Sequence, residues 1–280
     1  MPELTNPRSE RVKAVRALAG RSARLRSGRF LVEGPQAVRE AVRFRAASVA
    51  DVYVTQESGD RYPEITRAAA EAGVRVHLAS AEVLEAMSDD AQHVLAVAAT
   101  TRLDLDAALS RSPRLVAVLA NVRDPGNAGT VIRAADACGA DLVVLAGDSV
   151  DVHNPKVVRS TAGSLFHLPV VTGVTVTQAV DGLRSARLGV LAADGSGEHD
   201  LDDLLDLAAG PGQVTGGAPD LRRPTAWLFG NEAWGLSEAE RDLADAVVRV
   251  PIRGLAESLN LATAATVCLY ASSRAQRAAG

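Results

Sequence analysis

Three loops of this sequence combine glycine-bearing turns with side chains that are able to do chemistry. The first, NVRDPGNAGTVIR at 121–133, places Asn127 and Arg133 six positions apart. The second, FGNEAWGLS at 229–237, has Glu232 between two glycines. The third, VPIRGLAESLNLATAA at 250–265, has Ser258 and Asn260 where a helix is expected to open. A guanidinium binds anions, and a carboxylate or amide beside it can orient a substrate.

Each loop also has an ordinary structural interpretation. DPGN is a common turn, an asparagine that opens a helix is usually its cap, and a glutamate between glycines can simply face solvent. Arg133 is harder to explain in this way, because a partly buried guanidinium on an otherwise apolar helix face requires an anionic partner. The occurrence of all three loops, each after an expected strand, is more specific than any one of them.

The elements that must position these loops form two α/β segments, which we assign to domains 1–105 and 112–280. The expected strands of the first are 30–34, 49–55, 74–79 and 93–100, and its expected helices are 35–44, 62–73 and 80–89. After a polar linker (101–114), strands are expected at 115–120, 142–147, 170–173, 188–194, 225–230 and 246–252, and helices at 128–139, 175–186, 237–245 and 258–276. Residues 195–224 read as a flexible insertion with one short acidic helix. Alternating strands and helices predict a mainly parallel sheet that is covered on both faces. Ligands of such sheets bind at the carboxyl ends of the strands.

Composition excludes several classes of protein. The chain has 280 residues, 47% of them hydrophobic and 23% charged, which is typical of a soluble globular protein. No apolar run approaches the ~20 residues that span a bilayer, and the first residues lack the apolar core of an export signal. Only Cys138 and Cys268 are present, so we expect neither disulfides nor a cysteine metal site, and both thiols are expected in the core. A cytoplasmic protein with no membrane contact is predicted.

Positive charge gathers at the front of the chain. Residues 1–45 hold eleven Arg and Lys residues and four glutamates, whereas the whole chain has a net charge of −4. Clustered cations gain affinity for a polyanion by displacing its counterions, so this segment is a candidate RNA-binding surface; a solvated basic helix face is the alternative. The candidate RNA contacts here are Arg8, Arg11, Arg24, Arg26 and Arg29.

Residues 112–278 resemble the SpoU (TrmH-type) branch of the SPOUT RNA 2′-O-ribose methyltransferases. The stretches that carry the resemblance are NVRDPGNAGTVIRAADACGA, LFGNEAWGLS and VPIRGLAESLNLATAATVCLY, which are similar to the three signature motifs of that branch. The resemblance implies a parallel sheet with a C-terminal trefoil knot, a bent S-adenosylmethionine held by the knot loops, no metal, and a homodimer. The first domain is similar in layout to the small ribosomal-protein-like domain that many rRNA-modifying members use to bind RNA.

The resemblance also implies roles for individual residues. The catalytic group would be Arg133, Asn127, Glu232, Ser258 and Asn260. The cofactor contacts would be Leu228, Gly230, Asn231, Ile252, Leu259 and Leu261. The segment DVHNPKVVRSTAGSLF would place His153 and Lys156 near the active site. Its candidate RNA contacts are Asn154, Arg159, Ser160 and Ser164, for which ordinary packing is the alternative.

The function predicted is transfer of a methyl group from S-adenosylmethionine to a ribose 2′-hydroxyl of RNA, most specifically 23S rRNA, in a housekeeping role or to confer antibiotic resistance. Arg133 would either lose its charge to act as the base or stay charged and stabilise the developing alkoxide. The alternatives are a tRNA 2′-O-methyltransferase, a non-catalytic RNA-binding protein and a dinucleotide-dependent enzyme, the last weakened by the lack of G-x-G-x-x-G. Aromatic residues make up only 3% of the chain, which argues against serial base stacking.

Overall fold

A computed structural model describes residues 2–210, 214 and 217–278 of the chain. The chain forms two compact units. The N-terminal unit contains the residues up to Thr101 together with Asp151–His167, and the C-terminal unit contains Arg102–Val150 and the residues from Leu168 onward. No described helix is long and apolar enough to cross a membrane.

The N-terminal unit is built on a four-stranded sheet with the order β1-β4-β2-β3. Its strands are β1 (Arg29–Glu33), β2 (Val49–Val54), β3 (Arg75–Leu78) and β4 (Val94–Ala99), at the places that the sequence predicted. β4 runs antiparallel to both β1 and β2, and β3 runs parallel to β2. The helices are α1 (Glu10–Ala17), α2 (Arg21–Ser27), α3 (Pro35–Arg45), η1 (Ala46–Ser48), α4 (Gln56–Arg61), α5 (Pro63–Glu71) and α6 (Ala81–Met87).

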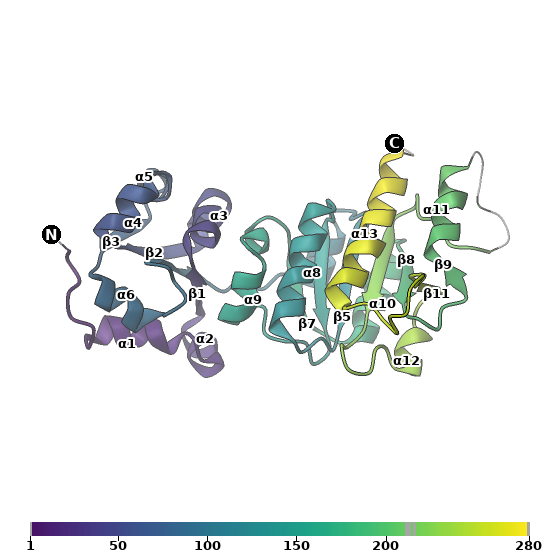
Figure 1. Cartoon of the computed structure of the whole chain (residues 1–280), viewed down its shortest axis with the longest axis horizontal. Helices are drawn as coiled ribbons and strands as arrows, with labels where there is room; N and C mark the ends of the chain where they lie inside the picture. The colour runs from purple at the N-terminus through teal and green to yellow at the C-terminus, as the bar shows by residue number, and fades with distance from the viewer. Residues whose placement is uncertain (1, 211–213, 215–216, 279–280) are drawn as a thin grey trace. The chain divides into compact units, whose positions relative to one another are not determined.

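Helices cover both faces of this sheet, as Figure 1 shows for α3 and α5 on one side and α1 and α6 on the other. Successive side chains of a strand point to opposite faces, so Phe30 and Val32 of β1 join the core under α3 and α5, whereas Leu31 joins the core under α1 and α6. The basic leader (residues 2–28), for which a helix was named only in the alternative interpretation, forms α1 and α2.

The segment Asp151–His167 belongs to the N-terminal unit, although our predicted boundaries put it in the second domain. It forms α9 (Pro155–Ser160) and η2 (Ser164–Phe166), and it contributes Val158 and Phe166 to the core that α3 covers. The predicted domain 112–280 is therefore corrected at Asp151–His167: the N-terminal unit is discontinuous in sequence. The apolar residues of the segment Asp151–His167 could not reveal its position, because their pattern predicts a helix but does not identify the sheet on which the helix packs.

Arg24 fastens this segment to the leader. Its side chain is 4% exposed, and its guanidinium donates hydrogen bonds to Asp151 Oδ2 at 2.7 and 3.0 Å and to the carbonyls of Leu18 and Ala19. Burial raises the pKa of the Asp151 carboxyl, but hydrogen bonds from Arg24 and from the backbone of His153 outweigh that effect and lower it. Arg24 was predicted to contact RNA; its burial corrects that prediction to a structural role.

We expect Arg24→Ala to lower the free energy of unfolding by about 3 kcal/mol, because it leaves a half-buried carboxylate without its partner. Since the folded-state pKa of Asp151 is lowered, the stability from this pair is present above the unfolded-state pKa and is lost as the pH falls through the folded-state value. Urea unfolding at neutral and acidic pH measures both effects. Arg26→Ala, an exposed position on the same helix, is the control and should leave stability unchanged; equal losses in the two variants would contradict this role for Arg24.

The C-terminal unit contains a seven-stranded sheet with the order β7-β6-β5-β10-β8-β11-β9, and all of its neighbouring strands run parallel. Its strands are β5 (Leu115–Ala120), β6 (Leu142–Ala146), β7 (Val170–Val174), β8 (Gly189–Ala193), β9 (His199–Asp200), β10 (Thr225–Phe229) and β11 (Ala246–Arg249). Its helices are α7 (Leu105–Leu109), α8 (Pro125–Ala137), α10 (Val176–Ser185), α11 (Leu201–Ala209), α12 (Glu238–Arg241) and α13 (Leu261–Ala278). The predicted parallel sheet is confirmed.

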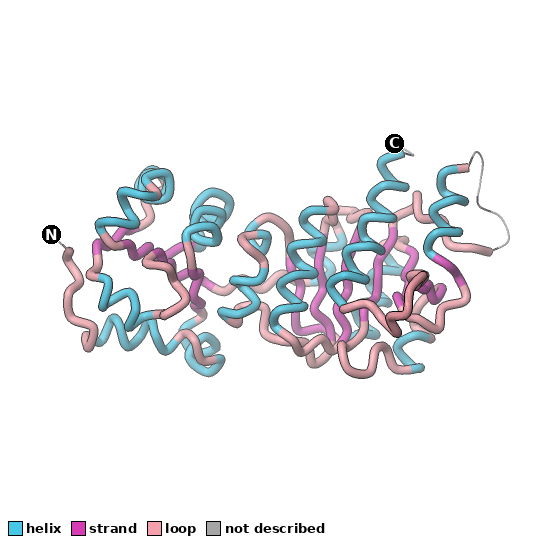
Figure 2. The backbone as a smooth tube through the Cα atoms, viewed as in Figure 1, coloured by secondary structure: helices cyan, strands magenta, loops and turns pink. Residues whose placement is uncertain are grey.

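Helices lie on both faces of the parallel sheet, which explains why its central strands are apolar throughout. Figure 2 shows α8 and α13 side by side in front of the strands, and α7 and α10 pack on the opposite face. The central strand β10 serves both layers: Leu228 packs toward α10, and the indole nitrogen of Trp227 donates to Ser272 Oγ on α13 at 2.9 Å. Cys138 and Cys268 are buried, as predicted.

Two stretches differ from the predicted elements. The linker 101–114 contains α7, whose first turn is capped by the side chain of Asp104. The insertion 195–224 contains β9 and the expected acidic helix, α11, while residues 211–213 and 215–216 lie outside the described residues. α7 and β9 were not predicted, because elements as short as these give too little periodicity to be found from sequence.

Candidate active site

The first loop delivers Asn127 with its side chain uncommitted to the backbone. Asp124, not Asn127, caps α8: its Oδ1 accepts a hydrogen bond from the amide of Asn127 at 2.7 Å, and Pro125 begins the helix. The ordinary structural interpretation of Asn127, as the cap of this helix, is therefore wrong. Because Asp124 satisfies the helix end, the side-chain carboxamide of Asn127 is free to bond other loops.

Asn260 of the third loop meets Asn127. Its Oδ1 accepts from the amide of Ala262 at 2.9 Å in the first turn of α13, and its Nδ2 donates to Asn127 Oδ1 at 3.0 Å. One side chain therefore caps α13 and joins it to the start of α8. The predicted opening of the C-terminal helix at 258 moves to Leu261.

The second loop completes the contact. It is a tight turn after β10, closed by two backbone hydrogen bonds between Asn231 and Gly235 of 3.0 and 2.8 Å. Glu232 lies within it, and its Oε1 accepts from Asn127 Nδ2 at 3.3 Å. A continuous set of side-chain hydrogen bonds thus runs from Asn260 through Asn127 to Glu232, and it joins all three loops.

Asn121 is a further organising residue that sequence reasoning missed. Its carbonyl accepts from Asn231 Nδ2 at 2.8 Å, and its own Nδ2 donates to Glu240 Oε1 at 2.7 Å, so it ties the end of β5 to the second loop and to α12. Its φ of +56° is one that asparagine adopts more readily than most residues. An asparagine directly after a buried strand was the available signal.

A cavity of about 830 Å³ opens beside these three loops. Glycine and apolar residues make up much of its wall, and the polar residues in it are Asp194, Asn231, Glu232, Arg249, Glu257, Ser258 and Asn260. Five of the six predicted cofactor residues line it: Gly230, Asn231, Ile252, Leu259 and Leu261. Leu228 does not line it, and its side chain is buried in the core toward α10, so its cofactor contact stays a prediction.

Arg133 lies on α8, about one and a half turns after Asn127, and it is exposed rather than partly buried as predicted. No ion pair or hydrogen bond of its guanidinium is found within the described part of the chain, and Arg133 does not line the cavity. An exposed arginine of this kind is available to a large anionic substrate. Ser258 is also exposed, at the cavity wall.

Comparison with known proteins identifies the family. The model of the SpoU rRNA Methylase family matches residues 114–270, more than half of the chain and the region that holds all three loops. This chain belongs to the SpoU rRNA methylase family. Members of this family are RNA methyltransferases, so the chain is an enzyme of that class.

Individual relatives agree with this assignment. A 23S rRNA (uridine(2479)-2′-O)-methyltransferase of Streptomyces viridochromogenes is 34% identical over 277 residues, which cover 98% of this chain and 92% of the relative. The 23S rRNA (guanosine(2553)-2′-O)-methyltransferase RlmP of Bacillus subtilis is 30% identical, with 96% and 98% covered. The solved SpoU methyltransferase AviRb from S. viridochromogenes, in complex with AdoMet, has a TM-score of 0.80 and 33% identity, with 97% and 100% covered.

The N-terminal unit of this SpoU-family chain matches a second family model, the MRM3-like substrate binding domain, over residues 9–96. Of the predicted RNA contacts in this unit, Arg8, Arg11, Arg26 and Arg29 are exposed. Nothing in the sequence distinguishes these four exposed arginines from the buried Arg24, because all five lie in one basic stretch.

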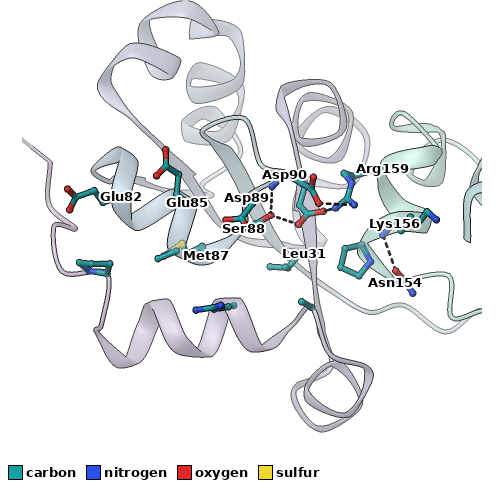
Figure 3. A pocket seen from close by; sticks show the side chains of 16 residues that line it. Leu31, Glu82, Glu85, Met87, Ser88, Asp89, Asp90, Asn154, Lys156 and Arg159 are labelled. Carbon is teal, nitrogen blue, oxygen red and sulfur yellow. Dashed lines mark hydrogen bonds and ion pairs between the residues drawn. The ribbon is translucent and has the colours of Figure 1, made fainter.

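Arg159 is engaged inside the N-terminal unit. Its guanidinium forms ion pairs with the buried Glu33 and, at 2.9 Å, with Asp90, beside a cavity of about 740 Å³ (Figure 3). Ser88 Oγ donates to the same glutamate at 2.5 Å. Because two carboxylates already neutralise Arg159, the structure corrects its predicted role from RNA contact to a structural tie.

The neighbouring candidates of this segment also have structural roles. Asn154 Oδ1 accepts from the amide of Lys156 at 3.0 Å and caps α9, and Ser160 Oγ donates to the Lys156 carbonyl at 2.8 Å. The His153 ring lies 4.6 Å from the ring of Phe30, and burial lowers its pKa. Ser164 is buried, whereas Lys156 is exposed.

Proposed function

We propose that this enzyme transfers a methyl group from S-adenosylmethionine to a ribose 2′-hydroxyl of 23S rRNA. The observation that carries the proposal is the hydrogen-bonded set Asn260–Asn127–Glu232, which joins the three family motifs at the edge of one cavity. The names of the relatives, which are 23S rRNA 2′-O-methyltransferases, support this substrate over tRNA.

The cavity fits the proposed cofactor. Apolar residues such as Ile252, Leu259 and Leu261 offer a surface for an adenine ring, and the carboxylates of Asp194, Glu232 and Glu257 favour a cationic ligand. When bound, S-adenosylmethionine supplies a methyl group on a sulfonium. The sulfonium leaves as a neutral thioether, which needs no metal. We include the C-terminal trefoil knot in the proposal, supported by the fact that the loop between β11 and α13 and the turn after β10 line the same cavity.

The protein residues would act mainly by positioning and by charge. The ribose hydroxyl must face the methyl carbon in line at about 3–3.5 Å, and the Glu232–Asn127–Asn260 set fixes the edge of the site where it would lie. Arg133 would stabilise negative charge on the 2′-oxygen as the proton leaves to a substrate phosphate, because a guanidinium keeps its charge in proteins. Its exposure therefore favours the electrostatic alternative over Arg133 as base.

RNA would be held first by the N-terminal unit. The exposed Arg26 and Arg29 stand at the end of α2 and the start of β1, and they are free to contact phosphates. We expect Arg26→Ala/Arg29→Ala to weaken binding of 23S rRNA and to reduce the slope of log K against log salt by about 2. Filter binding across a salt series measures the affinity and its salt dependence. An unchanged slope would show that neither arginine contacts the RNA.

A homodimer in the cytoplasm is part of the proposal. Val267 and Tyr270, which are 39% and 65% exposed, give α13 an apolar outer surface that a second copy can cover. Light scattering of the purified protein tests this; a monomeric mass would contradict it.

The test of the function uses tritium-labelled S-adenosylmethionine with transcripts of 23S rRNA and of tRNA. The proposal predicts stoichiometric label in 23S rRNA and little in tRNA. Preferential labelling of tRNA would establish the tRNA alternative. RNA binding without any label would establish a non-catalytic RNA-binding protein.

A further inference from the structure

Trp234 is a large aromatic side chain placed in solvent beside the active site. It is 58% exposed, whereas the second tryptophan of the chain, Trp227, is fully buried. Trp234 lies two residues after Glu232 in the turn that follows β10, but it does not line the cavity. The cofactor proposed for the cavity therefore gives no role to this indole.

The turn holds Trp234 in a fixed position. Asn231 and Gly235 are paired through both backbone groups, and Asn231 Oδ1 accepts from the amide of Ala233 at 2.8 Å. Gly235 has a φ of +69°, which a glycine adopts without strain. The backbone around the indole is thus defined on both sides, as a binding surface requires.

Arg123 of the first loop accompanies the indole. Its guanidinium carbon lies 5.5 Å from the centre of the Trp234 ring, within the range of a cation–π contact. Arg123 is exposed and directly precedes Asp124, the cap of α8. The pair therefore spans the same two loops that the Asn127–Glu232 hydrogen bond joins.

We propose that Trp234 and Arg123 form a stacking surface for an unpaired base of the RNA, next to the ribose that is methylated. The inference rests on the proposed function. A base has an aromatic face that stacks on an indole whatever its identity, and a guanidinium adds a cation–π contact or a bond to the adjoining phosphate. A single stacking surface can hold one nucleotide that is turned out of the RNA helix at the active site. Binding of this kind differs from serial stacking of many bases, which the low aromatic content argues against.

The experiment compares Trp234→Ala, Trp234→Phe and Arg123→Ala with the wild-type enzyme on a 23S rRNA transcript. Loss of one stacked base costs roughly tenfold or more in affinity, so Trp234→Ala should raise the KM for RNA about tenfold while the Kd of S-adenosylmethionine stays unchanged. Trp234→Phe keeps an aromatic face and should recover most of the loss. Leu207→Ala removes another exposed apolar side chain of the same unit, outside the cavity, and serves as the matched control.

A direct readout is the fluorescence of Trp234 during titration with an eight-nucleotide oligo(A), in the presence of S-adenosylhomocysteine. Quenching is expected in the wild-type protein and not in Trp234→Phe, because the remaining Trp227 is buried. An unchanged KM for RNA in Trp234→Ala would overturn the inference. A loss of activity that accompanies a change from dimer to monomer would also overturn it, because Trp234 would then act in assembly and not in base stacking. Failure of the proposed function is a separate result: the wild-type enzyme would then label no RNA.

Discussion

Arg133→Ala is expected to lower kcat for RNA methylation by roughly 10²- to 10³-fold, the usual effect of removing a group that stabilises transition-state charge. The Kd of S-adenosylmethionine should be almost unchanged, because Arg133 is exposed on α8 and does not line the cavity. The free energy of unfolding should also stay the same, since the side chain has no partner within the described residues whose loss would destabilise the fold.

Single-turnover methylation and calorimetric titration with the cofactor measure these effects. Arg133→Lys keeps the charge but not the forked geometry, so it should retain part of the activity. Arg111→Ala, another exposed arginine of the C-terminal unit, is the matched control and should behave as wild type. Full activity in Arg133→Ala would contradict both the electrostatic role and the alternative of Arg133 as base.

Gly230→Ala is expected to abolish cofactor binding and to destabilise the C-terminal unit by about 3 kcal/mol. A Cβ at this position would lie 2.3 Å from the carbonyl carbon of Gly235 and 2.4 Å from the amide nitrogen of Leu236. Both are backbone atoms of the turn that carries Glu232, so the turn must move as a whole. Its movement would break the Asn127–Glu232 contact and reshape the cavity.

Gly189→Ala is the matched control, because Gly189 begins the neighbouring strand β8 and the atom nearest to its added Cβ is 3.9 Å away. Urea unfolding and calorimetry with S-adenosylmethionine separate the two effects. Normal cofactor affinity in Gly230→Ala would show that the turn does not need its present position, and it would remove the structural basis of the proposed cofactor site.

The main architecture could be predicted from the sequence because apolar periodicity fixes it. The runs at 115–120 and 142–147 are apolar throughout, as buried parallel strands must be, and the structure has β5 and β6 there. The three loops were found because unusual residues follow such strands. Their meeting also followed from the sheet, since parallel strands end at one edge.

Side-chain partners and docking could not be predicted in the same way. Arg24 and Arg26 stand on one short helix in the same basic stretch, yet only Arg24 finds a carboxylate, which comes from a residue 127 positions away. The segment Asp151–His167 reads as part of the second domain until its contacts with the N-terminal sheet are seen. Both depend on distant packing, on which local sequence carries no information.

Nucleoside mass spectrometry of 23S rRNA treated with the enzyme and S-adenosylmethionine shows whether the three joined loops direct a methyl group to a sugar. At equal reaction times we predict one 2′-O-methylated nucleoside with the wild-type enzyme and roughly a hundredth of that amount or less with Arg133→Ala. A methyl group on a nucleobase would exclude a ribose methyltransferase, and equal ribose methylation by the two proteins would exclude a catalytic role for Arg133.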